Sequence, residues 1–320
     1  MKLFVTGGAG FIGSNYARHV LATTGDSVTV YDALTYAGNL DNLRGLDDDP
    51  RFAFTKGNIC DRDTVLAAMS GHDAVVHFAA ESHVDRSILS PDEFVHTNCD
   101  GTNVLCDVAR HIGVERFLHV STDEVYGSIE EGSFREGDPL GPRSPYSASK
   151  AASDLIALSY RTTYGLPVVV TRSSNNFGPY QFPEKVIPLF VTNLLQGQKV
   201  PLYGDGMNVR DWCYVEDNAA AIHLVLQQGA VGEIYNIGAG NEVSNRALTD
   251  TILDHLGLDN SMIDYVDDRP GHDRRYSIDS SKVRSLGWAP RHNFAEALAD
   301  TISWYRTNEW WWTPLKSRSL

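Results

Sequence analysis

Cysteine is scarce in this sequence, and no apolar run is long enough to predict a helix that spans a membrane. The 320 residues include only Cys60, Cys99, Cys106 and Cys213, and none of these forms a Cys-x-x-Cys pair. Such spacing is typical of free thiols in a reducing compartment. No signal-peptide pattern precedes the first predicted strand, so we expect a cytoplasmic protein.

Basic residues are also few relative to acidic ones. The sequence has 27 Lys and Arg residues and 41 Asp and Glu residues, which gives a formal net charge of −14. A chain this acidic is not attracted to nucleic acid or to an anionic membrane surface, so we expect neither as a partner. The eleven histidines show no His-x-His or His-Glu-x-x-His spacing, and we therefore expect no metal site. An anionic small molecule fits this composition only where basic residues gather locally.

Short apolar runs alternate with helical stretches through the first half of the chain. Repeated units of this kind predict an α/β fold, in which a doubly wound parallel sheet has helices on both faces. The predicted strands are 2–8, 27–33, 52–59, 73–80, 117–122 and 167–174, and the predicted helices include 10–25, 91–113 and 146–164.

The alternation breaks after about residue 175, which predicts a second, smaller domain built from interrupted segments. We expect the Rossmann-type domain to comprise 1–175 with 211–238 returning to it, and the smaller domain to comprise 176–210 and 239–320. In the smaller domain Phe294, Leu298, Ile302 and Tyr305 recur at helical spacing. The run 310–312 is three tryptophans, which we interpret as packing or an interface and to which we assign no chemistry.

The stretch VTGGAGFIGS lies between the first predicted strand and the first predicted helix. Its glycines at 7, 10 and 13 allow a tight turn and let backbone N–H groups approach a pyrophosphate. Asp32 ends the second strand 19 residues after Gly13, where an acid that binds a ribose belongs. Its charge would repel a 2′-phosphate, so the pattern predicts NAD rather than NADP; the alternative is merely a tight strand–helix turn.

Tyr146 and Lys150 lie four residues apart at the start of a predicted helix. Residues at this spacing are neighbours on any solvated helix face, so the pair alone proves little. A lysine ammonium beside the phenol would lower the pKa of the tyrosine and make it a usable base. The preceding strand ends in Thr122, so all three side chains can meet at the carboxyl edge of the sheet, where such folds bind ligands.

Two adjacent carboxylates, Asp123 and Glu124, follow Thr122 directly. Adjacent acids at the end of a buried strand repel each other and resist desolvation, which makes their position unusual. For an arbitrary Asp-Glu pair, a turn or a helix cap is the simpler interpretation.

The motifs TGGAGFIGS, STDEVYG and YSASK resemble those of the extended short-chain dehydrogenase/reductase superfamily. Within it, STDEVYG, AAESHVDRS, RSSNNFGPYQFPEKVIPLF, LYGDGMNVRDWCYVED and DRPGHDRRYSID resemble the dTDP-glucose 4,6-dehydratase family. The resemblance covers nearly the whole chain. Nucleotide-sugar epimerases share the early motifs, whereas the Thr-Asp-Glu run is more selective.

The resemblance implies a hydro-lyase that converts dTDP-glucose to dTDP-4-keto-6-deoxyglucose. Tyr146, assisted by Thr122 and Lys150, would remove the O4 proton while tightly held NAD takes the C4 hydride. Glu124 would then remove the C5 proton, and protonated Asp123 would protonate the departing C6 hydroxyl before hydride returns to C6. A coupled pair of carboxylates can hold the unequal protonation states that this elimination needs.

The resemblance also implies the residues that hold NAD. In the family an Asp commonly stands where this chain has Asn58, whose amide oxygen can still accept a hydrogen bond from adenine. The implied cofactor residues are Gly7, Gly10, Phe11, Ile12, Gly13, Asp32, Leu34, Thr35, Asn58, Ile59, Phe78, Ala79, Ala80, Thr97, Tyr146, Lys150 and Asn176.

A nucleotide-diphosphate hexose is the implied substrate, and its diphosphate requires local positive charge. Lys185, Arg210, Arg269 and His272 would supply that charge, while Pro201 and Tyr203 flank the base. The implied substrate residues are Ser82, Thr122, Asp123, Glu124, Asn175, Lys185, Val186, Pro201, Tyr203, Arg210, Asn245, Arg269 and His272.

We expect a homodimer in which the helices around 91–113 and 146–164 form a four-helix interface. Val104, Leu105 and Val108 on the first, and Leu155, Ile156 and Leu158 on the second, offer apolar surface beyond one sheet contact. Two alternatives to the dehydratase remain. A nucleotide-sugar 4-epimerase would need no acid pair, and an NAD-sensing protein on the same fold would need no Tyr–Lys pair.

Overall fold

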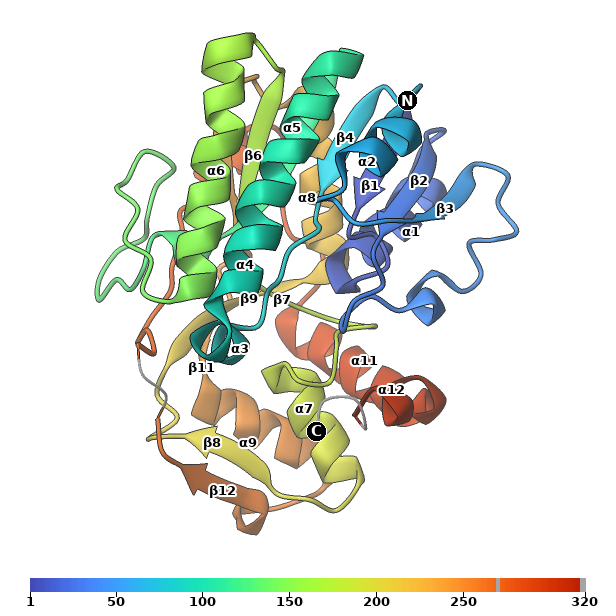
Figure 1. Ribbon diagram of the computed structural model, residues 1–320. Coiled ribbons are helices and arrows are strands. Elements are labelled where there is room, and N and C mark those ends of the chain that lie inside the picture. The colour runs from blue at the N-terminus through green and yellow to red at the C-terminus, as the bar shows by residue number, and fades with distance from the viewer. Residues whose placement is uncertain (269–270, 317–320) are drawn as a thin grey trace.

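The computed structural model describes residues 1–268 and 271–316, and its centre is a seven-stranded sheet in the order β10-β6-β5-β4-β1-β2-β3 (Figure 1). Each neighbouring pair of strands is parallel, which confirms the predicted doubly wound α/β fold. The strands are β1 (Lys2–Thr6), β2 (Ser27–Asp32), β3 (Phe52–Lys56), β4 (Ala74–His77), β5 (Arg116–Thr122), β6 (Val168–Ser173) and β10 (Ile234–Ile237).

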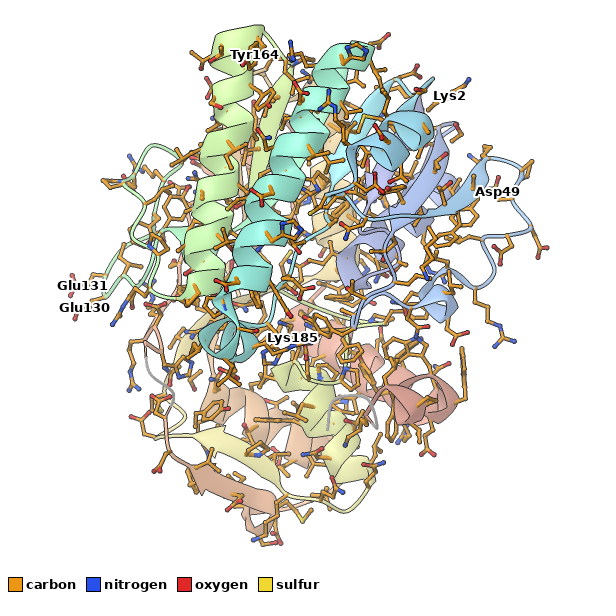
Figure 2. All side chains as sticks on the ribbon, in the orientation of Figure 1. Lys2, Asp49, Glu130, Glu131, Tyr164 and Lys185 are labelled. Atoms are coloured by element: carbon orange, nitrogen blue, oxygen red, sulfur yellow. The ribbon has the colours of Figure 1, made fainter. Side chains whose placement is uncertain are left out.

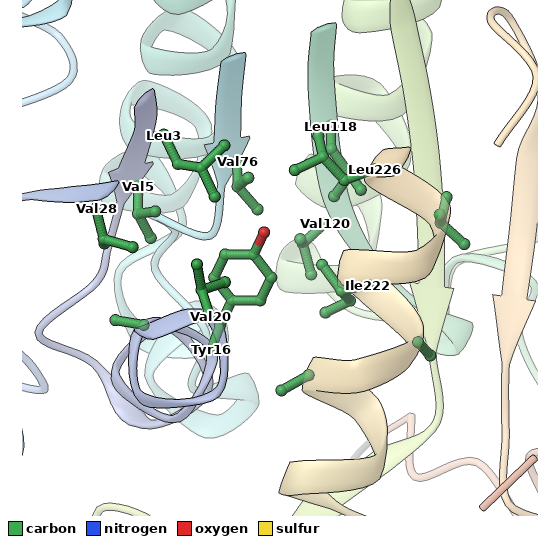
Figure 3. Close-up of a cluster of buried hydrophobic side chains, with 14 of the residues drawn as sticks. Leu3, Val5, Tyr16, Val20, Val28, Val76, Leu118, Val120, Ile222 and Leu226 are labelled. Carbon is green, nitrogen blue, oxygen red and sulfur yellow. The ribbon is translucent and has the colours of Figure 1, made fainter. Parts of the chain in front are cut away.

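Helices cover both faces of this sheet, and we call the sheet with its helices the larger lobe. One face is covered by α1 (Phe11–Thr23) and α8 (Val215–Gln228), and the other by α2 (Arg62–Met69), α5 (Gly101–Ile112) and α6 (Pro145–Tyr164). Figure 3 shows Tyr16 and Val20 of α1 beside Ile222 of α8, against apolar strand residues. Burial on both faces explains why these strands are nearly continuous apolar runs.

The predicted helix over 91–113 is interrupted in the structure. It consists of α4 (Pro91–Val95), a π-helical turn (His96–Asp100) and α5, and α3 (Val84–Leu89) precedes it. The expectation that Leu105 and Val108 offer surplus apolar surface is wrong, because both are fully buried against the sheet. Val104, Ile156 and Leu158 are partly buried there, whereas Leu155 is 60% exposed.

A smaller lobe lies below the carboxyl edge of the large sheet in Figure 1. Its three-stranded sheet contains β7 (Asn175–Phe177), β9 (Val209–Tyr214) and β11 (Glu242–Ser244), and a parallel pair is formed by β8 (Val200–Tyr203) and β12 (Ile263–Val266). Its helices are α7 (Val186–Leu195), α9 (Asn245–Leu256), α11 (Phe294–Thr307) and α12 (Glu309–Lys316). The predicted spacing of Phe294, Leu298, Ile302 and Tyr305 falls on α11, which packs into the core of this lobe.

Segments cross between the two lobes near the predicted boundaries. α8 and β10 belong to the larger lobe, whereas β9 pairs within the smaller sheet up to Tyr214. Val283 of α10 (Ser281–Ser285) and Trp288 join the core of the larger lobe. The division into two domains stays a prediction at these boundaries. No helix within 1–268 or 271–316 is long and apolar enough to cross a membrane.

Candidate active site

A cavity of about 330 Å³ runs along the carboxyl edge of the large sheet. The ends of β1, β2, β4, β5 and β6 converge there, as expected for a ligand site in an open α/β fold. Every implied cofactor residue lines the cavity except Leu34. The topology therefore brings together residues that span positions 7 to 176 of the chain.

The glycine-rich loop after β1 has the conformation that its sequence predicts. Gly7 has φ of +69°, and a Cβ added there would lie 2.5 Å from the backbone nitrogen of Ala79. A Cβ on Gly13 would clash with the carbonyl oxygen of Gly7. At Gly10 an added Cβ would meet only that oxygen, at 3.2 Å. The close approaches at Gly7 and Gly13 require glycine, and a tight loop of this kind can turn backbone N–H groups toward a pyrophosphate.

Two backbone hydrogen bonds hold the Asp32 carboxylate in place at the end of β2. One of its carboxylate oxygens accepts a hydrogen bond from the Ala9 N–H at 2.9 Å, and the other accepts one from the Leu34 N–H at 2.8 Å. Burial raises the pKa of Asp32, and these two hydrogen bonds act against that rise. Leu34 has φ of +55° and contributes this backbone contact, although its side chain does not line the cavity.

Asn58 lines the same cavity between β3 and α2. Its amide oxygen already accepts a hydrogen bond from the Cys60 N–H at 2.9 Å. An amide oxygen has two lone pairs, so one stays available for a ligand.

The net pKa of Tyr146 is raised in this structure, and not lowered as we expected from the sequence. Desolvation raises the pKa of Tyr146 well above its usual value, and the charges of Glu124 and Asp123 raise it further. The interaction with the Thr122 side chain lowers the pKa but does not offset this rise. Lys150 Nζ donates to the Val120 carbonyl oxygen at 2.8 Å. Burial lowers the pKa of Lys150 to about 8, so it is still a cation at neutral pH.

Asp123 begins a short 3₁₀ helix (Asp123–Val125) directly after β5, and it is only 3% exposed. Burial, followed by the charges of Glu124 and Asp211, raises its pKa well above the usual carboxyl range. Thr122 Oγ1 donates to Asp123 Oδ1 at 3.2 Å, while the buried Oδ2 has no hydrogen-bond partner among the described residues. Burial and the neighbouring carboxylates therefore favour the protonated form of this carboxyl group, which can donate its proton.

A second cavity, of about 800 Å³, lies between the larger lobe and α7, β8 and α9 of the smaller lobe. Glu124 lines both cavities, so the second opens onto the reaction groups of the first. Of the implied substrate residues, Ser82, Thr122 and Asp123 line the smaller cavity. Asn175, Lys185, Val186, Pro201, Tyr203, Arg210, Asn245 and His272 line the larger one.

Basic groups converge on the second cavity as a diphosphate requires. Lys185 Nζ donates to the Ser82 carbonyl oxygen at 2.8 Å, and Figure 2 shows Lys185 where the two lobes meet. The Arg210 guanidinium lies over the Tyr276 ring, 4.1 Å from its centroid. His272 contacts Asp268 at 2.6 Å. Arg269, the other predicted cation, lies outside the described residues.

The sequence interpretation missed several buried polar atoms in residues that line the cavities. Glu184 Oε1, Trp212 Nε1 and Gln181 Oε1 have no hydrogen-bond partner among the described residues. Buried groups of this kind normally have partners, so they are candidates for ligand contacts. Glu184 precedes Lys185 in the stretch RSSNNFGPYQFPEKVIPLF, but no spacing rule distinguishes it from a surface glutamate.

Comparisons with known proteins agree with this geometry. A family model described as GDP-mannose 4,6 dehydratase matches residues 4–301. A dTDP-glucose 4,6-dehydratase from Streptomyces antibioticus is 57% identical to this chain. The alignment is 325 positions long, gaps included, and covers 99% of this chain and 96% of the relative. One from Escherichia coli is 47% identical and covers 98% and 95%.

Solved structures show the same fold with two chemistries. The dTDP-glucose 4,6-dehydratase DesIV from Streptomyces venezuelae, with NAD and TYD bound, superposes with a TM-score of 0.97 at 55% identity, over 98% of this chain and 100% of that one. The UDP-glucose 4-epimerase from Thermus thermophilus, a complex with NAD, gives 0.89 at 32% identity, over 96% and 100%. Fold alone therefore does not choose between dehydration and epimerisation.

Proposed function

The chain belongs to the dTDP-glucose 4,6-dehydratase family, and on that premise we propose that it removes water from dTDP-glucose to give dTDP-4-keto-6-deoxyglucose. The observation that carries the proposal is the acid pair at the end of β5. Asp123 is buried with a raised pKa beside Tyr146, which is the arrangement that an elimination uses and an epimerisation does not need. The enzyme is thus a hydro-lyase that depends on NAD.

The chain's residues fit NAD, since the glycine loop closely approaches the cavity and Asp32 faces it. When bound, NAD supplies a hydride acceptor for C4 and a hydride donor for C6. The backbone N–H groups of the loop and of the first turn of α1 would hold the pyrophosphate. The Asp32 carboxylate would accept hydrogen bonds from the ribose hydroxyls.

Tyr146 removes the O4 proton, and Thr122 and Lys150 assist it. The raised pKa of Tyr146 means that its phenolate needs nearby positive charge. Lys150 is a cation one helical turn away, and the interaction with the Thr122 side chain acts against the rise in the pKa of Tyr146. The three side chains come from β5 and α6, so the packing of this helix on this strand sets their geometry.

Glu124 takes the C5 proton after C4 has been oxidised, and Asp123 protonates the departing C6 hydroxyl. The two roles differ because the two environments differ. Asp123 is buried in surroundings that favour its protonated form, whereas Glu124 is half-buried and lines both cavities. Asp123 Oδ2, the oxygen without a partner among the described residues, is the atom that would hold the transferred proton.

The nucleotide occupies the larger cavity in this proposal. Arg210, Lys185 and His272 neutralise the diphosphate, and Asn245, which also lines this cavity, hydrogen-bonds near the phosphates. Pro201 and Tyr203 of β8 flank the base. Ser82 and Asn175 hold the hexose, and Arg269 is assigned to the phosphates by resemblance alone.

A panel of nucleotide hexoses tests the function. The enzyme should convert dTDP-glucose to a product that has lost one water, as measured by mass spectrometry. It should need no stoichiometric NAD, because the hydride is returned within each turnover. A product of unchanged mass with an altered sugar configuration would identify an epimerase instead.

We also propose that the enzyme is a cytoplasmic homodimer. Ile88, Leu89, Val95 and Leu155 are 41%, 86%, 52% and 60% exposed, and their helices α3, α4 and α6 pack against one another. This apolar surface suits a second copy of the chain in a four-helix interface. Light scattering should give twice the chain mass of 35.3 kDa, and the monomer mass would exclude the dimer.

A further inference from the structure

Trp311 links the C-terminal helix to the opposite end of the sequence. It lies on α12, is 2% exposed, and donates from Nε1 to Asn42 Oδ1 at 2.8 Å. Asn42 is also buried and belongs to a 3₁₀ helix (Leu40–Leu43) in the connection between β2 and β3. The two partners are 269 residues apart in the sequence.

Asn42 also forms a hydrogen bond with the glycine-rich loop. Its Nδ2 donates to the Ala9 carbonyl oxygen at 2.8 Å, and the Asn39 N–H donates to the same oxygen at 3.0 Å. The Ala9 N–H donates in turn to Asp32 Oδ2 at 2.9 Å. Ala9 stands between Gly8 and Gly10, so these bonds fix the one residue in the middle of the loop that has a side chain.

Aromatic and cationic contacts hold the same region together. Arg18 Nη2 donates to the Asn42 carbonyl oxygen at 2.7 Å, and its guanidinium lies 4.9 Å from the centroid of the Tyr180 ring. The Tyr180 ring packs edge-on against Trp311 and Trp304, with centroids 5.7 Å and 4.8 Å apart. In Figure 1, α12 accordingly lies beside the loop region that follows β2.

We propose that Trp311 is a positioning residue of the NAD site, which acts through Asn42 on the Ala9 carbonyl. Glycine-rich segments have many accessible conformations, and a pyrophosphate binds best when its N–H donors are already oriented. The Trp311–Asn42–Ala9 chain restricts the loop to that orientation. Retention of NAD by the larger lobe therefore depends on a helix of the smaller lobe. This inference rests on the proposed NAD-dependent function.

The test compares Trp311→Phe with Trp312→Phe. Trp312 is a matched control, because it lies on the same helix, is also 2% exposed, and donates from Nε1 at 2.7 Å to the Tyr305 carbonyl oxygen within the smaller lobe. NAD-loaded protein is diluted, and bound nucleotide is measured over time. We expect NAD to dissociate about 5- to 20-fold faster from Trp311→Phe, since a buried hydrogen-bond acceptor is left unsatisfied, but not from Trp312→Phe.

A second readout follows amide hydrogen exchange over residues 7–13 without added nucleotide. Exchange should be faster in Trp311→Phe and in Asn42→Ala than in Trp312→Phe. Combining Trp311→Phe with Asn42→Ala should raise the exchange rate little beyond that of either single variant. Equal NAD retention, or equal exchange, in the Trp311 and Trp312 variants would overturn the proposal. If wild-type protein failed to bind NAD, the proposed function would fall, and the exchange comparison would still decide whether Trp311 orients the loop.

Discussion

Two aspartates lie at the same edge of the large sheet and have opposite surroundings. Asp32 is the last residue of β2 and Asp123 follows β5, and they are 7% and 3% exposed. Both oxygens of Asp32 accept backbone hydrogen bonds, whereas Asp123 has one bonded oxygen, one without a partner among the described residues, and two carboxylates nearby. Burial alone therefore does not set the role of an acid. We propose that their different hydrogen-bond partners make Asp32 a residue that binds the cofactor and Asp123 a proton donor.

A similar contrast separates the glycine-loop end of the smaller cavity from the place where the two cavities meet. The cofactor side consists of backbone groups and an acid that local hydrogen bonds already hold in place. The reaction side keeps buried polar atoms without a partner among the described residues, including those of Asn175, Glu184 and Trp212. Such atoms destabilise the folded chain unless a ligand satisfies them. The four predictions below separate binding from chemistry along this division, from the largest effect to the smallest.

Replacing Tyr146 by Phe should remove the base for C4 oxidation. We expect turnover to fall by about 10³-fold or more, toward the upper range for a positioned acid–base group. No absorbance of reduced nicotinamide should appear after rapid mixing with dTDP-glucose. Appearance of that absorbance at the wild-type rate would show that another group removes the O4 proton.

Replacing Asp123 by Asn or Glu124 by Gln should leave C4 oxidation possible and slow the loss of water by about 10²- to 10⁴-fold. Reduced nicotinamide should then accumulate on the enzyme, because oxidation outruns elimination. The same rapid-mixing trace measures this, with Tyr146→Phe as the control that shows no accumulation. Wild-type turnover in either acid variant would contradict the assigned roles.

Asp32→Asn should affect binding and leave the chemistry intact. An amide cannot accept from both the Ala9 and Leu34 N–H groups, and it lacks the charge that suits ribose hydroxyls. We expect NAD affinity to fall about 10- to 100-fold, measured by titration, with little change in the maximal rate at saturating NAD. A loss of maximal rate equal to that of Asp123→Asn would remove the distinction between the two aspartates.

The smallest effect concerns stability and pH. The pKa of Asp123 is raised in the folded state, so its protonated form stabilises the fold at low pH, and this contribution is lost as pH rises above the ordinary carboxyl value of 3.8. Asp123→Asn should therefore be more stable than wild type at neutral pH, as measured by denaturant unfolding. The difference should shrink toward pH 4; a constant difference would mean that Asp123 titrates normally.

Features set by local sequence were predictable, and features set by tertiary packing were not. The glycine loop, the acid at the end of β2 and the Tyr–Lys spacing each lie within one strand–helix unit, and their positions follow from it. The raised pKa of Tyr146 depends on carboxylates and burial around the folded site. The Trp311–Asn42 contact joins residues 269 apart, so a run of tryptophans could be interpreted only as packing.

The most direct test of the account follows the C4 hydrogen through one reaction. dTDP-glucose deuterated at C4 is converted in ordinary water, and the product is analysed by mass spectrometry and NMR. Return of the hydride to C6 predicts a 4-keto-6-deoxy sugar that carries the deuterium at C6. Deuterium retained at C4 of a sugar that has lost no water would contradict the dehydratase assignment and the roles of Asp123 and Glu124.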